Sequence, residues 1–159
     1  MLVKTLAHGK AVINRLVTRG RSRKQLAWVA LDTEAQSFPG QPPDDVLILG
    51  RADFLVFSAC VLGESYTFPT CLVDASFPTL KQWIDHVFGP LFQDDSVVKV
   101  FHNANFDASQ LWFQGLRKPR NLHCTMIGAW KSHADLPKGL KERAVLYGRH
   151  LRKTGSVDF

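Results

Sequence analysis

The sequence predicts an α/β protein in which a mixed β-sheet carries helices on both faces. Short apolar runs typical of buried strands alternate with segments whose apolar residues recur at helical spacing. Two of the runs are separated by the turn-like residues 63–65, which predicts a hairpin. The resulting order is strand, hairpin, helix, strand, helix, strand, helix, and this order describes a mixed sheet with packed helices.

The first third of the chain contains one weak helix and one strong strand. Residues 3–17 have weak helical periodicity, and residues 19–24 form a polar, basic connector. Residues 26–31 are predicted to form a buried strand that ends in acidic side chains. A loop is expected at residues 37–43, which are rich in proline, and residues 46–49 fit either a strand or a loop.

The middle of the chain is predicted to form a hairpin and a helix. The hairpin arms are residues 54–62 and 66–73, with Pro69 indicating an edge strand or a bulge in the second arm. A helix should begin near Pro78 and carry its buried residues between Phe77 and Leu91.

The last third of the chain alternates strands and helices. Strands are predicted at residues 97–101 and 122–125. Helices are predicted at about residues 106–116, 126–132 and 138–151.

The composition describes one soluble globular domain. A chain of 159 residues is long enough to bury a core without disulfides. No apolar stretch approaches the roughly 20 residues that span a bilayer, and residues 1–10 lack a continuous signal-peptide core. The three cysteines indicate neither a zinc site nor a disulfide framework. We therefore expect a cytoplasmic protein without a signal peptide or membrane contact.

The net charge of +6 is unevenly distributed. Residues 1–24 contain seven Lys or Arg and no acid, residues 25–114 contain three bases and eleven acids, and residues 115–159 contain ten bases and three acids. An acidic centre between basic ends fits a metal site flanked by surfaces that attract a polyanion. Ordinary solvated lysines and arginines explain the same charge equally well.

Three acidic residues carry the strongest chemical signal. Asp32 and Glu34 are one residue apart on a predicted strand, so their side chains point to the same face. Such concentrated negative charge near a core requires compensation, and Mg²⁺ prefers carboxylate oxygens. With Asp107 alongside, the three acids could hold two ions about 3.5–4 Å apart, as in enzymes that hydrolyse phosphodiesters. The leading hypothesis is a metal-dependent nuclease.

These motifs resemble the 3′–5′ exonuclease domain of family A DNA polymerases, within the DEDD exonuclease superfamily. Residues 31–34 (Leu-Asp-Thr-Glu) resemble the first motif, and residues 103–107 (Asn-Ala-Asn-Phe-Asp) resemble the second. Residues 125–130 and 139–144 resemble the helices that follow. The resemblance covers residues 26–148, so we assign residues 26–159 to an exonuclease-like domain and residues 1–25 to a basic, partly helical N-terminal extension.

The resemblance implies an RNase H-like fold and two Mg²⁺ or Mn²⁺ ions that act on the 3′ end of single-stranded DNA. Asp32 would bridge the ions, Glu34 would hold one, and Asp107 would orient the other through an outer-sphere water. The resemblance also places Thr33, Ala35, Asn103 and Phe106 at the substrate. The residues alone leave alternatives open, because Asp107 could cap its helix, Asn103 could bond the local backbone, and Phe106 could be a core residue.

The third motif of the family is absent from its expected place. In the family, a fourth carboxylate follows a Tyr by four residues or a His by five. Here Tyr147 leads to Leu151 and His150 leads to Gly155. We expect a truncated or split exonuclease that is completed by another segment, a polymerase chain or another subunit. The alternatives are an RNA-directed exonuclease and a non-catalytic nucleic-acid-binding or scaffold subunit.

Overall fold

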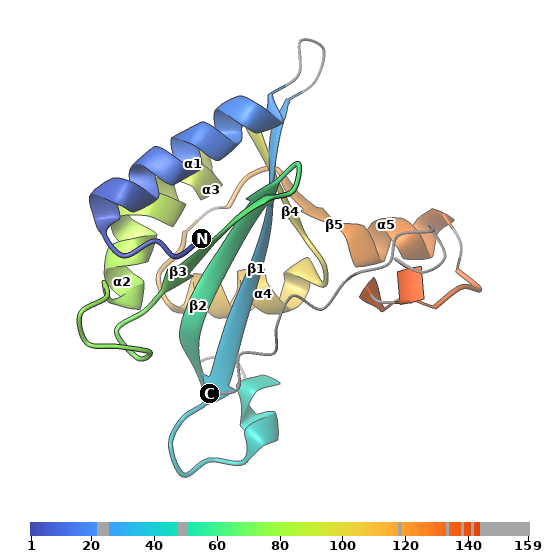
Figure 1. Cartoon of the computed structure of the whole chain (residues 1–159). Helices are drawn as coiled ribbons and strands as arrows, with labels where there is room; N and C mark the ends of the chain where they lie inside the picture. Colours follow the sequence, from blue (N-terminus) through green and yellow to red (C-terminus); the bar gives the residue numbers. More distant parts are fainter. Residues whose placement is uncertain are drawn as a thin grey trace.

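The predicted order of elements is confirmed in the computed structural model, which describes residues 1–21, 26–47, 51–117, 119–132, 134–137, 139–140 and 142–143 (Figure 1). The helices are α1 (Leu6–Gly20), η1 (Pro43–Leu47), α2 (Leu80–Trp83), η2 (Ile84–Phe88), α3 (Gly89–Gln93), α4 (Ala104–Phe113) and α5 (Thr125–Ser132). The strands are β1 (Ala27–Ser37), β2 (Ala52–Val61), β3 (Glu64–Pro69), β4 (Val97–Phe101) and β5 (Leu122–Cys124).

The five strands form one mixed sheet in the order β3-β2-β1-β4-β5. Strand β1 pairs antiparallel with β2, and β2 pairs antiparallel with β3. Strand β4 pairs parallel with both β1 and β5. Strand β3 is an edge strand, as the sequence suggested, but it ends at Pro69 instead of continuing to residue 73. The N-terminus lies along this edge, because Val3 N–H donates to the Thr67 carbonyl at 2.8 Å.

The two faces of the sheet receive different side chains because successive strand residues alternate. On β1, Val29, Leu31 and Thr33 are buried on the face that we call the core face. Asp32 and Glu34 are exposed on the opposite face, which we call the carboxylate face. Helices α1, α2 and α3 lie on one side of the strands in Figure 1, and α5 lies to the other side, beyond β5.

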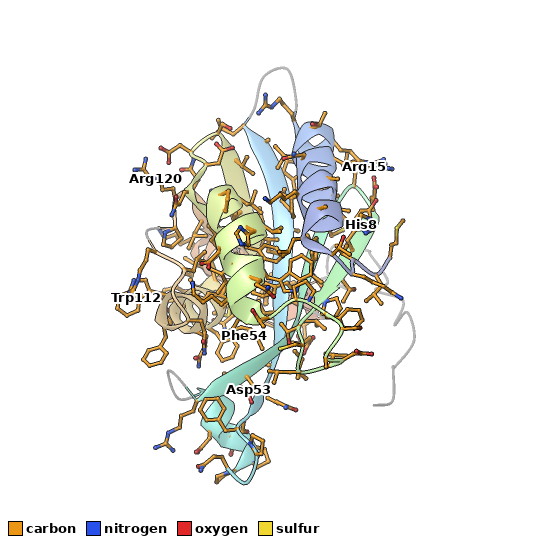
Figure 2. All side chains as sticks on the ribbon, turned by 90° about the vertical axis from the view of Figure 1, so that its left-hand side faces the viewer. His8, Arg15, Asp53, Phe54, Trp112 and Arg120 are labelled. Carbon is orange, nitrogen blue, oxygen red and sulfur yellow. The ribbon has the colours of Figure 1, made fainter. Side chains whose placement is uncertain are left out.

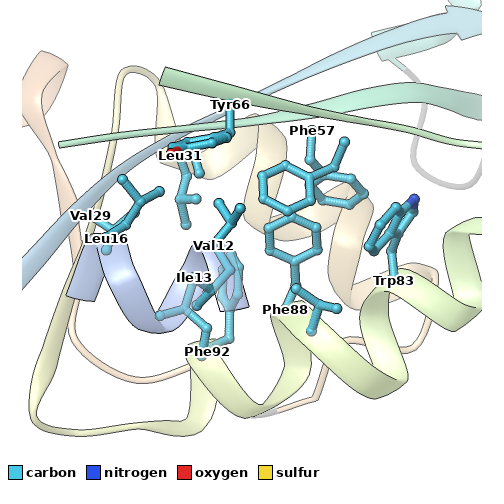
Figure 3. Close-up of a cluster of buried hydrophobic side chains, with 14 of the residues drawn as sticks. Val12, Ile13, Leu16, Val29, Leu31, Phe57, Tyr66, Trp83, Phe88 and Phe92 are labelled. Carbon is cyan, nitrogen blue, oxygen red and sulfur yellow. The ribbon is translucent and has the colours of Figure 1, made fainter. Parts of the chain in front are cut away.

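Aromatic rings fill the space between the core face and the helices (Figure 3). The Phe57 ring stacks on Phe88 with centroids 4.3 Å apart, and Phe68 meets Trp83 edge-on at 5.5 Å. The indole N–H of buried Trp83 donates to the Pro69 carbonyl at 2.7 Å, so its polar atom is satisfied. This packing ties the helices to the hairpin.

Helix α1 is built into this core. Val12, Ile13 and Leu16 are buried in the same cluster as the strand residues. Gly20 lies against the Trp28 carbonyl so closely that an added Cβ would be 2.2 Å from that oxygen. In Figure 2, α1 runs beside the α2–α3 segment in front of the sheet. The helix is therefore no detached arm, although a domain boundary at residue 25 stays a prediction.

The predicted helix around residues 77–91 is correct in place but irregular in form. It begins after Thr79, whose side chain and that of Gln82 form a capping box. Its middle is the π-turn η2, where the Gly89 N–H bonds to the Ile84 carbonyl, five residues earlier. Pro90 has no N–H to continue a regular ladder, so the wider turn is the physical consequence of this residue.

Other boundaries differ by a few residues. Strand β1 continues to Ser37, past the predicted end at Leu31, and α4 begins at Ala104 rather than Phe106. Residues 43–47 form the short helix η1, where the sequence had left strand or loop open from residue 46. Most of the helix predicted at residues 138–151 lies outside the described residues. In the part that the structure describes, no helix is long and apolar enough to cross a membrane.

Candidate active site

The predicted acids lie where the parallel strands β1 and β4 part. Pairing between these strands ends at Ala30 and Val100, and Asp32 follows two residues later on β1. Asp32 and Glu34 both extend from the carboxylate face, as the alternation predicted. The chain leaving β4 turns directly into α4, whose first turn carries Asp107. The strand end and the helix start therefore bring the two sequence motifs to one place.

Asp107 is held by the strand that carries the other acids. The Thr33 hydroxyl donates a 2.5 Å hydrogen bond to Asp107 Oδ1, and both residues are buried. The Thr33 side chain lies on the core face, where it donates to Asp107. Its contribution in this geometry is to position a carboxylate. A contact between Thr33 and substrate stays a prediction.

Desolvation and mutual repulsion raise the pKa values of the three carboxyl groups. Burial raises the pKa of Asp107 to about 6, and the nearby charge of Asp32 adds to this rise while the Thr33 hydrogen bond opposes it. Although the Asp32 side chain is exposed on the carboxylate face, partial loss of water around it also raises its pKa. The pKa of Glu34 is raised by burial and by Asp32. Asp32 is thus electrostatically coupled to both other acids.

The three acids are neighbours, but their side chains do not converge on one metal-binding point. Among the described residues, no three His, Cys, Asp or Glu side chains gather closely enough to hold a metal ion. The side chain of Asp107 is turned to Thr33, whereas Asp32 and Glu34 share the carboxylate face. The assignment of Asp32, Glu34 and Asp107 as metal ligands stays a prediction.

The remaining predicted substrate residues lie around the same point. Ala35 follows the register shift between β1 and β2, a bulge that re-aims the strand just after Glu34. Asn103 is left-handed (φ 63°), and its carbonyl accepts from the Phe106 N–H at 3.0 Å. The Asn103 side chain makes no helix-capping hydrogen bond, and with half-buried Phe106 it lines a pocket.

The lack of ligand spacing in the sequence predicts an ordinary polar role for His102, but the structure places His102 and Thr125 in one pocket with Asp32. His102 Nδ1 is 2.9 Å from Thr125 Oγ1, and the Thr125 hydroxyl is 3.2 Å from the Phe101 carbonyl oxygen. Asp32, His102 and Thr125 line one pocket, whose walls also include Ala30, Leu31, Ser58, Cys60, Val100, Phe101 and Leu140. The available signal was the position of His102, immediately before the second motif at a strand end.

The fold and these motifs together define a protein of the 3′–5′ exonuclease domain class. The chain belongs to the 3′–5′ exonuclease domain family, whose sequence model, described as "3′–5′ exonuclease", matches residues 13–142. The match begins within α1, so part of this helix belongs to the family domain as well. A comparison with curated protein sequences found no match.

Several solved structures are similar to this chain in fold. The catalytic core of RRP6 from Trypanosoma brucei is 19% identical, with a TM-score of 0.66 over 99% of this chain and 37% of its own. RNase D from Escherichia coli, an exoribonuclease involved in structured RNA processing, is 13% identical, with a TM-score of 0.63 over 97% and 35%. NrnC from Brucella melitensis is 23% identical, with a TM-score of 0.58 over 84% and 59%. The chain thus spans less than two thirds of each.

The donor set fits the divalent ions that DEDD exonucleases use. Three carboxylates supply the hard oxygen ligands that Mg²⁺ and Mn²⁺ prefer. The raised pKa values of Asp32, Glu34 and Asp107 indicate negative charge that the surrounding protein does not fully offset. A bound pair of ions would supply activation of water and stabilisation of charge on the phosphate.

Proposed function

We propose that this domain hydrolyses single-stranded nucleic acid from the 3′ end, with Asp32, Glu34 and Asp107 binding two Mg²⁺ or Mn²⁺ ions. The observation that carries the proposal is the coupling of Asp32 to both other acids at the junction of β1, β4 and α4. In this arrangement Asp32 would bridge the ions, Glu34 would hold one, and Asp107 would orient the other. Asn103, Phe106 and the backbone at Ala35 would contact the terminal nucleotide.

The fourth carboxylate is proposed to come from a further segment or from a partner such as a polymerase chain. The pocket beside Asp32 supports this proposal, because its walls are mostly apolar and include Ala30, Val100 and Leu140. An amphipathic helix could bury its apolar side there and present an acid to the ions. Without that acid, we expect the 159-residue chain to hydrolyse DNA feebly, because misplacing a catalytic group by 1 Å can cost on the order of 100-fold in rate.

Single-stranded DNA is the substrate that the polymerase-type motifs favour, with proofreading as the corresponding role. RNA is the second candidate, because RNase D from Escherichia coli is an exoribonuclease and the RNase D of Trypanosoma brucei was solved with the RNA U12. Recognition of RNA would require contacts to the 2′-hydroxyl. A DNA and an RNA oligonucleotide of the same sequence, compared side by side, distinguish these substrates.

The test combines hydrolysis with metal binding. Excess protein is incubated with 5′-labelled oligonucleotides in Mn²⁺, Mg²⁺ or EDTA, and a ladder that shortens from the 3′ end with release of nucleoside monophosphates is expected. Asp32→Asn should remove both the ladder and the rise in melting temperature produced by Mn²⁺. Identical responses of wild type and Asp32→Asn to millimolar Mn²⁺ would show that the ligand assignment is wrong.

A non-catalytic nucleic-acid-binding subunit is the second candidate function. It is favoured by the orientation of Asp107, whose side chain is hydrogen-bonded to Thr33 while Asp32 and Glu34 share the carboxylate face. This candidate predicts nucleic-acid binding that is retained in EDTA and unchanged in Asp32→Asn. Metal-dependent shortening of the substrate would exclude it.

A further inference from the structure

His102 is fixed beside Asp32 by the geometry of two neighbouring strands. Ala30 pairs with Val100, and two residues later β1 places Asp32 and the end of β4 places His102. Both residues line the same pocket.

The protonation of the His102 ring follows from its hydrogen-bond partners. The Phe101 carbonyl can only accept, so the single proton of the Thr125 hydroxyl is directed to that oxygen at 3.2 Å. The Thr125 oxygen must then accept from His102 Nδ1–H, 2.9 Å away. In the neutral ring, Nδ1 therefore carries the proton and Nε2 carries a lone pair. Thr125 thereby fixes the ring orientation and the tautomer together.

In this tautomer each of the two pocket-lining residues offers a hydrogen-bond acceptor, His102 through Nε2 and Asp32 through its ionised carboxylate. Two acceptors cannot bond to each other, but a water molecule can donate one hydrogen to each. The lone pairs of such a water point away from both acceptors. That orientation is the one an attacking oxygen needs.

We propose that His102 is a residue of the hydrolytic reaction, which accepts a hydrogen bond from the attacking water and orients it together with Asp32. The role rests on the proposed exonuclease function and needs no proton transfer to the ring. Thr125 is the positioning residue behind it, because its hydroxyl fixes the tautomer. A merely structural His102 would instead lower the melting temperature without a selective loss of turnover.

The experiment measures turnover of a 5′-labelled single-stranded oligonucleotide, Mn²⁺ affinity by electron paramagnetic resonance, and melting temperature. His102→Ala should lower kcat on the order of 10- to 100-fold, since orientation of the reacting groups is lost. KM and Mn²⁺ affinity should stay within about twofold of wild type. His102→Gln is a second variant should the alanine variant unfold. His123→Ala, in an exposed histidine of β5, is the matched control and should leave kcat unchanged.

Thr125 supplies a rescue test. Thr125→Val removes the hydroxyl at nearly constant volume and should lower kcat in the same direction, whereas Thr125→Ser keeps the hydroxyl and should restore it. Nitrogen-15 NMR of the imidazole should show the Nδ1–H tautomer in wild type and Thr125→Ser, and its loss in Thr125→Val.

The outcomes separate this proposal from the proposed function. A wild type that hydrolyses the substrate while His102→Ala and His102→Gln keep its kcat overturns the role of His102 alone. An Nε2–H tautomer, or a loss of Mn²⁺ affinity as large as the loss of kcat, also overturns it. A wild type without metal-dependent hydrolysis under any condition contradicts the exonuclease function, and the role of His102 falls with it.

Discussion

The two faces of the sheet show how one strand can serve stability and chemistry at once. The core face of β1 buries Val29 and Leu31 against helices and aromatic rings. The carboxylate face exposes Asp32 and Glu34, whose pKa values are raised. Packing on the core face supplies the free energy of folding that offsets repulsion among the carboxylates. Thr33 connects the two faces, because its hydroxyl on the core face donates to Asp107.

The largest loss of stability is expected from a substitution in the core. Phe88→Ala should lower the free energy of unfolding by about 3–5 kcal/mol, because a fully buried ring stacked on Phe57 is replaced by a cavity. Phe113→Ala, at a ring that is 54% exposed, is the control and should cost less than about 1 kcal/mol. Urea denaturation measures both values. Equal losses would remove the distinction between the core and the surface.

The next effect concerns the carboxylate face. Mn²⁺ at 100 times its Kd should stabilise wild type by about 2.7 kcal/mol, since it binds the native state alone. Asp32→Asn should remove this gain while leaving the metal-free protein at least as stable, because one of the mutually repelling charges is gone. Melting curves with Mn²⁺ and with EDTA test this prediction. If metal-free Asp32→Asn unfolds at a much lower temperature than metal-free wild type, Asp32 stabilises the fold instead of destabilising it.

The pH dependence of stability follows from Asp107. Its pKa is about 6 in the native state, above the ordinary value of 3.8, so the native state binds the proton more tightly than the unfolded chain. The resulting stabilisation, on the order of 3 kcal/mol, is complete below about pH 4 and is lost as pH rises through about 6. In EDTA, wild type should show this decline from pH 4 to 6 relative to Asp107→Asn. Parallel profiles would mean that Asp107 has an ordinary pKa.

A smaller effect is expected where the two faces meet. Thr33→Val removes the hydroxyl that donates to buried Asp107 and should cost roughly 1–2 kcal/mol. The pKa of Asp107 should rise further, because the lost hydrogen bond had lowered it. Thr33→Ser retains the donor and should keep the wild-type pKa of Asp107 in carbon-13 NMR titration. If the pKa of Asp107 in Thr33→Val equals the wild-type value, Thr33 does not influence Asp107 and the link between the two faces is contradicted.

The smallest effect on stability is expected from substitutions of surface lysines on α1 and in the segment before it. Deleting residues 1–24 would remove core side chains such as Leu16, so the basic N-terminal region is better tested by charge neutralisation. Lys4→Gln combined with Lys10→Gln should leave stability unchanged and alter the slope of log affinity for DNA against log salt by less than about 2. A slope change near 2 would show that both lysines contact phosphates. No change would show that they are ordinary surface charges.

Local sequence determined most of the fold and the identity of the acids. Apolar periodicity predicted β4, the hairpin and the order of the elements, because strand and helix periods differ. Strand alternation alone placed Asp32 and Glu34 on one face. Boundaries were less predictable, since the extension of β1 to Ser37 depends on its pairing with β2.

Only the tertiary structure decided how these residues act on one another. The hydrogen bond from Thr33 to Asp107 joins positions 74 residues apart, and that from His102 to Thr125 joins positions 23 apart. No local pattern encodes such contacts, because they arise when strands pair and helices pack on the sheet. The raised pKa of Asp107 has the same origin, since burial by distant segments is its main cause. The sequence by itself therefore determined which acids are present, and the fold decided their charge, their partners and the histidine beside them.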